Sequence, residues 1–342
     1  MSKISEPLAT RHSQILGVGD YRPSRVVPNS EIVDLIDSSD EWIVQRTGIE
    51  SRRFASADES VVDMAIGAAE QALTRAKLTI GDIDTVVVAT ITYPHQAPSA
   101  ATAVIQRMGN PTAAAFDISA ACAGFCYGVA MAHDMVRAGS AKKVLVIGVE
   151  KISDFTDPTD RATAFIFADG AGAVVIGESD EPGIGPVEWG SDSENRDAIL
   201  MNPSWIEVRN TETQLTKADV KWPNITQEGQ KVFRWAVFSM SKAALKALDS
   251  AGLSVNEIDA FIPHQANVRI IETMAKEMKM PESVVIADDI RTNGNTSAAS
   301  IPLAMDTLLA KHPELHGKIA LLIGYGAGLV YAGQVVKLPP KP

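Results

Sequence analysis

Two stretches of the chain decide how we interpret its fold: residues 72–84 read ALTRAKLTIGDID, and residues 247–259 read ALDSAGLSVNEID. They lie 175 positions apart, and six of the thirteen aligned positions are identical. At the same offset residues 121–123 (ACA) align with residues 296–298 (TSA), so each copy continues into a turn of small residues. A duplicated unit of helix, strand and turn would stack two similar sheets about a pseudo-twofold axis. Chance similarity between two alanine- and leucine-rich helices is the alternative.

Short apolar runs rich in β-branched residues alternate with segments of helical periodicity, a pattern typical of an α/β protein. Two helices with one apolar face are expected at Val61–Ala76 and Phe233–Ala251. We expect two halves, residues 1–178 and 179–342, with a connection or cap within Ser179–Gln227, where the periodicity is weak. The expected strands are Thr85–Thr92, Ala114–Ile118, Lys143–Val149, Ala171–Ile176, Ala260–Ile262, Ser283–Ala287, Ile319–Ile323 and Val335–Lys337.

The composition is that of a compact globular protein. Its 342 residues allow about two domains, and 46% of them are hydrophobic. Lys and Arg number 31 and Asp and Glu number 42, which gives a net charge of −11. A general nucleic-acid binder needs the opposite balance, so we expect no nucleic-acid partner. An acidic partner would have to meet a local basic patch.

Cysteine content and hydrophobicity predict a cytoplasmic protein without a membrane segment. Cys122 and Cys126 are the two cysteines, which excludes a disulfide framework, and residues 1–15 contain no apolar stretch of signal-peptide length. The eighteen residues Ile319–Val336 carry no charge and reach the length of a membrane helix. Their four glycines and β-branched flanks instead predict two buried strands joined by a turn.

A cysteine is expected where a strand turns into a helix. Cys122 follows the expected strand Ala114–Ile118 and precedes a helical segment that ends near Gly139. Unpaired N–H groups at a helix N-terminus favour a thiolate, which is the nucleophilic form. Cys126, one turn later, is expected to face the interior. A small buried hydrophobic residue is the alternative interpretation of Cys122.

Two further segments could complete a site around Cys122. His264 directly follows a buried strand, and α/β proteins place active sites at strand ends. Asn295 lies in an Asn-Gly-Asn turn before a new helix and could present a fixed amide donor beside His264. A cysteine, a histidine and an amide are the groups that thioester chemistry through an enolate requires. The glycine loop Gly324–Gly328 is expected to bring its backbone close to the same centre.

The remaining histidines are expected to be solvated side chains. His312 and His316 have the spacing of a metal-binding pair, but Pro313 interrupts the helix that would hold them and no third ligand is evident. We therefore expect no metal. The other three are His12, His95 and His133.

These segments together resemble the β-ketoacyl-acyl carrier protein synthase III family of the thiolase superfamily, and actinobacterial members in particular. The motifs occur in the family's order over nearly the whole chain. They are Asp40–Ile49 (DEWIVQRTGI), Ala120–Phe125 (AACAGF), Asp157–Arg161 (DPTDR), Pro263–Asn267 (PHQAN) and Gly294–Ser300 (GNTSAAS). The resemblance implies a thiolase-like fold of two pseudo-symmetric halves in five layers, αβαβα, and a homodimer.

The resemblance also implies a reaction and its catalytic residues. An acyl-CoA primer would acylate Cys122, and malonyl-acyl carrier protein would then lose CO₂. The resulting enolate would attack the acyl group to give 3-oxoacyl-acyl carrier protein, in a decarboxylative Claisen condensation that initiates type II fatty acid synthesis. His264 and Asn295 would promote decarboxylation, and the backbone N–H groups of Cys122 and Ala327 would form an oxyanion hole. Acyl-CoA is then a substrate, with no cofactor or metal, and condensation should fail when His264 gains a proton.

By the same resemblance, further residues match binding positions of the family. The positions for CoA and pantetheine are Trp42, Arg46, Arg161, Phe233, Ala266 and Asn267, and Gln230 stands where relatives often have Asn. The positions for carrier-protein docking are Arg234, Arg269 and Lys276. Ala97 stands where relatives that prefer acetyl often carry Phe, so we expect an acyl pocket, with Phe167 beside it, that accepts branched or longer primers. The neighbours of Ala97 could equally fill that space.

Two other functions stay open at this stage. The first is a starter-unit ketosynthase or acyltransferase of a polyketide or other natural-product pathway, which would share Cys122, His264 and Asn295. The second is a non-catalytic partner protein in which Cys122 is a core residue.

Overall fold

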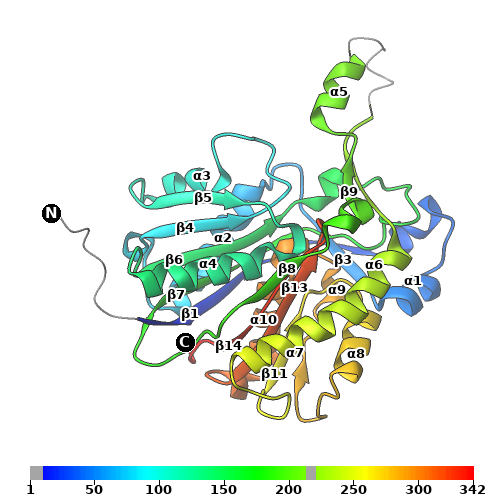
Figure 1. The fold of residues 1–342 in the computed structure, drawn as a ribbon. Coiled ribbons are helices and arrows are strands. Elements are labelled where there is room, and N and C mark those ends of the chain that lie inside the picture. Colours follow the sequence, from blue (N-terminus) through cyan, green and yellow to red (C-terminus); the bar gives the residue numbers. More distant parts are fainter. Residues whose placement is uncertain (1–10, 213–220) are drawn as a thin grey trace.

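The computed structural model describes residues 11–212 and 221–342. Two five-stranded sheets form its frame, and their spatial orders correspond: β1-β7-β6-β4-β5 in the first and β8-β14-β13-β11-β12 in the second (Figure 1). The first sheet contains β1 (His12–Tyr21), β4 (Thr85–Ala89), β5 (Ala114–Ile118), β6 (Lys143–Glu150) and β7 (Gly170–Ser179). The second contains β8 (Glu188–Ser191), β11 (Ala260–Pro263), β12 (Val285–Ile286), β13 (Ile319–Gly326) and β14 (Val330–Lys337).

Helices cover both outer faces of the sheets and fill the space between them. Two central helices contact strands of both sheets and pack within one shared core. Each outer pair has its own core against one sheet. The central pair is α4 (Gly124–Ala138) and α10 (Ser300–Lys311), and the outer pairs are α2 (Val61–Arg75) with α3 (Ala100–Met108) and α7 (Ser241–Ser250) with α8 (Val268–Glu277). The predicted five-layer αβαβα architecture is therefore confirmed.

Smaller elements lie around this frame. The short sheets are β2 (Arg25–Pro28) with β3 (Ser51–Phe54) and β9 (Ile199–Asn202) with β10 (Asn224–Gln227). The remaining helices are α1 (Asp40–Thr47), α5 (Trp205–Glu212), α6 (Gly229–Trp235) and α9 (Ile290–Asn293). The single turns that matter for the site are η4 (Ala121–Ala123) and η9 (Ser297–Ala299).

The internal repeat shifts by one residue at its centre. β4 and β11 begin 175 residues apart, as the sequence alignment predicts, whereas β6 and β13 begin and end 176 residues apart. The turns follow the offset of 176 residues. Ala121 in η4 and Ser297 in η9 are separated by this offset, and both adopt an unusual positive φ, 45° and 50°. The structural counterpart of Cys122 is therefore Ala298 rather than Ser297, and the aligned turn was wrong by one position.

The structure departs from the predicted elements in two instructive places. The helix expected at Phe233–Ala251 is interrupted by a π-helical turn, Ala236–Met240, between α6 and α7. β1 was not predicted, because glycines interrupt its apolar run. They serve packing: a Cβ added at Gly17 or Gly19 would lie within 2.5 Å of the backbone of α2. Their lack of a side chain thus lets this helix lie directly on the strand.

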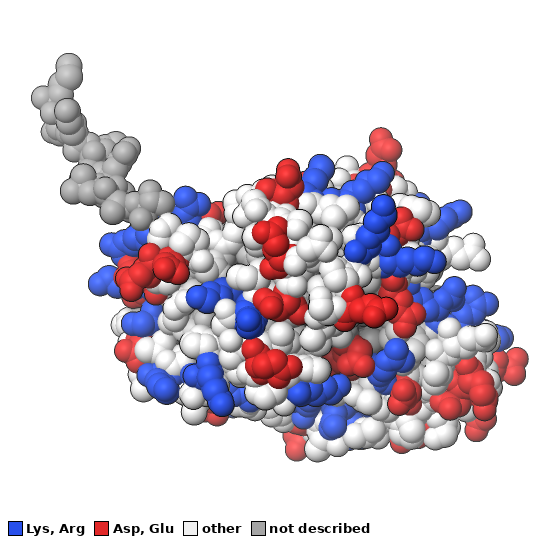
Figure 2. Space-filling view, turned by 90° about the horizontal axis from the view of Figure 1, so that it is seen from below, with Lys and Arg blue, Asp and Glu red and all other residues white. Residues whose placement is uncertain are grey.

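The uncharged stretch Ile319–Val336 forms the paired strands β13 and β14, as predicted. Within the described residues, no helix has both the length and the apolar character needed to cross a membrane. Residues 1–10, which contribute to the expectation of a cytoplasmic protein, lie outside the described residues. Acidic and basic side chains are interspersed over the face shown in Figure 2, so neither sign of charge dominates that face.

The segment Ser179–Gln227 holds β8, β9, α5 and β10, and α5 projects from the body of the molecule (Figure 1). Residues 213–220 of this segment lie outside the described residues. Ile199 and Ile225 line the cavity at Cys122, and the role of this segment as a cap stays a prediction. The domain boundary at residues 178 and 179 stays a prediction.

Candidate active site

Cys122 lies in a tightly packed turn between β5 and α4. Ala121 before it adopts a φ of 45°, which turns the chain sharply after the strand. The end of β13 lies directly against this turn, because a Cβ added at Gly326 would be 2.8 Å from both the backbone N and the Cβ of Cys122. Gly324 approaches Ala123 in the same way. The predicted close approach of the glycine loop to this centre is thus present.

The thiol of Cys122 is not a ready thiolate in the resting protein. Burial raises its pKa to about 12, and the nearby carboxylate of Glu150 adds to this effect. A hydrogen bond with Ser297 acts in the opposite direction. The sequence-based expectation of a lowered pKa was therefore wrong, because burial outweighs the positive end of α4. Cys126 is fully buried, as predicted.

His264 is held as a neutral imidazole at the end of β11. Its Nδ1 lies 2.7 Å from the Ser300 hydroxyl, which also accepts a hydrogen bond from the backbone N–H of Gln265. With Ser300 donating to Nδ1, the ring proton resides on Nε2. Burial lowers the pKa of His264 to about 3, and its ring meets Tyr325 edge-on with 5.1 Å between centroids. The histidine is therefore a neutral N–H donor throughout the neutral pH range.

The carboxamide of Asn295 has a fixed orientation. Its Oδ1 accepts a hydrogen bond from the backbone N–H of Ser297 at 2.9 Å. Because that N–H requires an acceptor, the oxygen must occupy this side and the amide nitrogen the other. The backbone of Asn295 bridges to Phe167, which ties the turn to the other half of the molecule.

One inner cavity of about 50 Å³ brings the predicted residues together. Cys122, His264 and Asn295 all line it, although they come from three separate segments of the chain. Phe167 and Ala327, the expected acyl-pocket and oxyanion residues, line the same cavity. The nucleophile candidate and both donor candidates therefore face one enclosed space.

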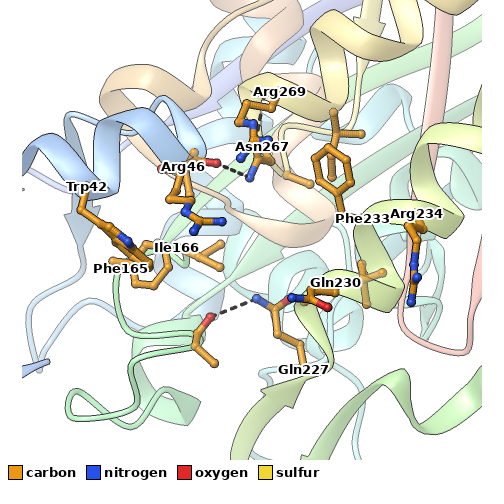
Figure 3. A pocket seen from close by; sticks show the side chains of 16 residues that line it. Trp42, Arg46, Phe165, Ile166, Gln227, Gln230, Phe233, Arg234, Asn267 and Arg269 are labelled. Atoms are coloured by element: carbon orange, nitrogen blue, oxygen red, sulfur yellow. Dashed lines mark hydrogen bonds between the residues drawn. The ribbon is translucent and has the colours of Figure 1, made fainter. Parts of the chain in front are cut away.

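An outer cavity of about 490 Å³ leads to the inner one. Figure 3 shows Trp42 and Arg46 of α1 on one side of it and Phe233 and Arg234 of α6 on the other. The guanidinium groups of Arg46 and Arg161 both lie over the Trp42 ring, at 5.5 and 5.6 Å from its centroid. The outer and inner cavities share the lining residues Gln227, Val232 and Ala266.

The helix that carries Trp42 and Arg46 is fixed by contacts at its C-terminal end. Gly48 ends α1 in the left-handed conformation, with φ 77°, and a Cβ there would lie 2.3 Å from Val268 of α8. The side chain of Asn267 donates to the Arg46 carbonyl at 3.0 Å (Figure 3). α1 and α8 are thereby held together on one wall of the outer cavity.

The three basic positions expected for carrier docking differ in whether they line the outer cavity. Arg234 and Arg269 line the outer cavity, and Arg269 lies over the Phe233 ring at 5.5 Å. Lys276 is exposed on α8 and is not among the residues that line this cavity. Two of the three positions therefore line the same cavity as Trp42 and Arg46, which match CoA-binding positions of the family.

Ala97 lies on the surface of the single chain, and its expected place at the acyl pocket stays a prediction. It is exposed in this chain and is not among the residues lining the inner cavity or its apolar neighbour. That neighbour has a volume of about 600 Å³ and shares Ile91 and Ile199 with the inner cavity. It is lined further by Ile118, Tyr127, Met131, Leu200 and Met201. Sequence reasoning missed these residues, since single apolar side chains in separate segments carry no motif.

Three of the other histidines form contacts with neighbouring groups of the protein. His133 is half-buried and its Nδ1 lies 2.7 Å from the Ser13 hydroxyl, so the expectation of a solvated side chain was wrong for this residue. His312 pairs with Glu314, and Nδ1 of His316 lies 3.0 Å from the Pro339 carbonyl. Across residues 11–212 and 221–342, no group of three or more His, Cys, Asp or Glu side chains could hold a metal ion.

Sequence-family comparison finds two matching models. The model described as 3-oxoacyl-[acyl-carrier-protein (ACP)] synthase III matches residues 116–193, and the model of the C-terminal part of that family matches residues 248–338. Among curated relatives, a β-ketoacyl-[acyl-carrier-protein] synthase III of Streptomyces coelicolor is 55% identical over 99% of this chain and 100% of the relative. The β-ketoacyl-[acyl-carrier-protein] synthase III of Mycobacteroides abscessus is 49% identical, over 100% of this chain and 99% of the relative.

Solved structures give the same result for the fold. The priming β-ketosynthase from the R1128 polyketide biosynthetic pathway superposes with a TM-score of 0.94 and 43% identity, covering 100% of this chain and 99% of that one. The 3-oxoacyl-[acyl-carrier-protein] synthase III from Aquifex aeolicus has a TM-score of 0.86 and 35% identity, over 95% and 99%. Both similarities extend over 95% or more of this chain.

Proposed function

The chain belongs to the 3-oxoacyl-[acyl-carrier-protein] synthase III family, and from this premise we propose that it condenses an acyl-CoA primer with malonyl-acyl carrier protein. The product is 3-oxoacyl-acyl carrier protein, and the reaction initiates type II fatty acid synthesis. The observation that carries the proposal is the inner cavity, where a thiol faces a neutral imidazole and an oriented carboxamide.

Each half-reaction uses a different part of this cavity. In the first, the Cys122 sulfur attacks the thioester carbon of acyl-CoA, and the backbone N–H groups of Cys122 and Ala327 stabilise the oxyanion that forms. In the second, malonyl-acyl carrier protein loses CO₂ while Nε2–H of His264 and the amide of Asn295 donate to its thioester oxygen. Neutral donors are required because a charged imidazolium would lack the pKa match to a transient enolate. The enolate carbon then attacks the acyl-cysteine carbon and releases Cys122.

The outer cavity is the proposed path for the CoA and pantetheine groups. Two guanidinium groups beside the indole of Trp42 can pair with phosphates by their fork of donors. The apolar cavity of about 600 Å³ beyond Cys122 gives room for the acyl chain, which supports branched or longer primers. Neither step requires a metal or a further cofactor. The two free cysteines are compatible with the reducing cytoplasm, where we place the protein.

A homodimer is the proposed assembly. β5 lies at the edge of the first sheet with one neighbouring strand in the described chain (Figure 1). Edge strands of this kind pair with another chain unless they are protected. β5 also leads into Ile118, Ser119 and Ala120, which line the apolar cavity, so a second copy at this edge would help to enclose the acyl chain. Light scattering should give twice the mass of the chain, and a monomer at micromolar concentration would contradict this assembly.

A second candidate function is the priming ketosynthase of a polyketide pathway. The specific observation in its favour is the similarity to the R1128 priming enzyme, at 43% identity and a TM-score of 0.94. The chemistry at Cys122 would be the same, and only the carrier protein that delivers malonate would differ. Competition between the fatty-acid and polyketide carrier proteins for one enzyme preparation separates the two.

A two-step assay tests the main proposal. Protein incubated with radiolabelled acyl-CoA should retain the label, and Cys122→Ala should not. Subsequent malonyl-acyl carrier protein should release CO₂ and transfer the label to the carrier. Label without CO₂ release would indicate simple acyl transfer, and no label on the unmodified protein would refute the proposal.

A further inference from the structure

A fully buried carboxylate lies behind the active-site cavity and is not used by the mechanism above. Glu150 ends β6 and is 0% exposed. Its Oε2 accepts hydrogen bonds from the Thr92 hydroxyl at 2.7 Å, the Ile91 N–H at 3.1 Å and the Thr90 hydroxyl at 3.2 Å. Its Oε1 accepts one from the Ser297 hydroxyl at 3.1 Å. All four partners are donors, which is the arrangement of an ionised carboxylate.

Ser297 connects this carboxylate to the nucleophile. Its hydroxyl donates to Glu150, and Ser297 lines the same inner cavity as Cys122 and lowers the pKa of that thiol. Its backbone is fixed on both sides, with a φ of 50° and an N–H that donates to Oδ1 of Asn295. A serine hydroxyl has one proton to donate and can accept another at the same time. While Glu150 is ionised, the hydroxyl donates to Oε1, and the lone pairs of its oxygen stay available for the proton that leaves the thiol during the reaction.

We propose that Ser297 and Glu150 form a proton relay that takes the proton of Cys122 during acylation and returns it after condensation. The proposal rests on the role of Cys122 as the acylated residue. As the sulfur bonds to the acyl carbon, its proton moves to Oγ of Ser297, and the hydroxyl proton of Ser297 moves to Oε1 of Glu150. The bond from the acyl carbon to the CoA sulfur breaks, and CoA leaves as a thiolate. Glu150 is then a neutral acid.

The second half-reaction closes the cycle. When the enolate carbon bonds to the acyl carbon, the bond to the Cys122 sulfur breaks and leaves a thiolate. Ser297 gives that thiolate its proton and receives one from Glu150, which becomes a carboxylate again. No proton is gained or lost by the protein over one turnover. Glu150 touches neither substrate, so it acts as a positioning residue through Ser297.

The surroundings of Glu150 favour this exchange. Burial raises its pKa to about 7, so both of its charge states are accessible near neutrality. Three titratable side chains line the inner cavity from other elements: Cys122 of η4, His264 after β11 and Tyr325 of β13. Burial keeps all three uncharged near neutral pH. Lys151, next along the chain, is directed away and donates to the carbonyls of Ser56 and Glu59.

The test is the pH dependence of acylation in Glu150→Gln, measured as the burst of CoA release together with the mass of the acyl-enzyme. For the unmodified enzyme we expect an acylation rate that increases with pH up to about pH 7 and stays constant at higher pH. The variant keeps the shape of the side chain but cannot take a proton, so we expect a rate lower by about 10²-fold. The acylation rate of the variant should also increase continuously up to pH 9 without a plateau, because attack then depends on the rare spontaneous ionisation of the thiol.

Further variants keep the test decisive if Glu150→Gln folds poorly. Ser297→Ala should give the same profile, and the double variant should be no slower than the slower single one, since both changes break one relay. Asp169→Asn is the matched control: this carboxylate is also buried with a pKa raised to about 6, but it binds Ala55 and Ser153. We expect its plateau to persist.

The outcomes separate the relay from the function on which it rests. A slower variant with an unchanged plateau would assign Glu150 a structural role and overturn the relay. Faster acylation in Glu150→Gln would do the same, because it would mean that the carboxylate only opposes ionisation of the thiol. If the unmodified protein releases no burst of CoA and gains no acyl mass, the proposed function itself fails.

Discussion

The two turns at the centre of the molecule share a backbone and differ in their side chains. η4 and η9 each begin with a residue in the left-handed region, Ala121 and Ser297, and each leads into a helix of the central layer. The next position is Cys122 in η4 and Ala298 in η9. The duplicated frame therefore supplies two equivalent turns, and only one of them presents a thiol at this position.

The strands that end against these turns show the same division. Glu150 ends β6 and Gly326, its counterpart, ends β13. Glu150 bonds to Ser297 of η9, whereas Gly326 lies against Cys122 of η4. At equivalent backbone positions, one half thus has Gly326, which lets Cys122 pack closely against it, and the other half has the carboxyl group of Glu150. Duplication set the geometry, and side-chain differences divided the chemical roles between the halves.

The largest effect should separate the two reaction steps, with Cys122 in the turn η4 and His264 after β11. Cys122→Ala should abolish both acyl transfer and product formation, because no thioester can form. His264→Ala should lower condensation by at least about 10²-fold while the burst of CoA release persists, since its donor acts only on the malonyl thioester. Single-turnover assays with acyl-CoA alone and with both substrates measure the two steps. Loss of the burst in His264→Ala would contradict this division.

The free energy of unfolding should depend on pH through Glu150 at the end of β6. Because burial raises the pKa of Glu150 from 4.5 to about 7, the folded protein holds this proton more tightly than the unfolded chain. Its contribution to stability is therefore fully present below pH 4.5 and is lost as the pH rises through 7. The difference corresponds to about 3 kcal/mol.

Relative to the unmodified protein, Glu150→Gln should thus gain stability between pH 5 and pH 8. Urea unfolding of both proteins at each pH gives this difference directly. A constant difference in the free energy of unfolding would show that Glu150 has the same pKa in the folded and unfolded states.

A smaller effect should follow from filling the glycine at the other strand end. The added Cβ in Gly326→Ala would be 2.8 Å from the backbone of Cys122, so the turn must move. We expect a loss of about 1–3 kcal/mol in the free energy of unfolding and a slower acylation step. Gly81→Ala is the control, because its nearest atom would be 3.6 Å away. Equal stability of both variants would argue against the tight contact.

The smallest effect concerns Lys276, an exposed residue of α8 that lies outside both turns. Lys276→Glu should raise the KM for malonyl-acyl carrier protein about two- to fivefold, since an exposed charge pair contributes at most about 1 kcal/mol. The effect should diminish at high salt, and acylation by acyl-CoA should be unchanged. Lys142→Glu makes the same change of charge on another exposed lysine and serves as the control. A similar KM in both variants would remove Lys276 from the docking surface.

Much of the site could be predicted because its residues stand in recognisable local patterns. Cys122, His264 and Asn295 each lie at a turn beside a strand or helix, and the structure places all three on one cavity. The apolar wall formed by Ile91 and Ile199 could not be predicted, because isolated isoleucines in separate segments resemble any core residue. The expected place of Ala97 at the acyl pocket stays a prediction, since this loop residue is exposed in the single chain.

The sequence by itself determined the duplicated α/β frame and pointed to the candidate reacting groups, because periodicity, small-residue turns and residue chemistry are local properties. Only the tertiary structure decided their charge states. The pKa of Cys122 and the pKa of His264 depend on burial, and burial arises when segments far apart in the chain pack together. The bond between Glu150 and Ser297 has the same origin, since 147 residues of chain separate the two side chains that it joins.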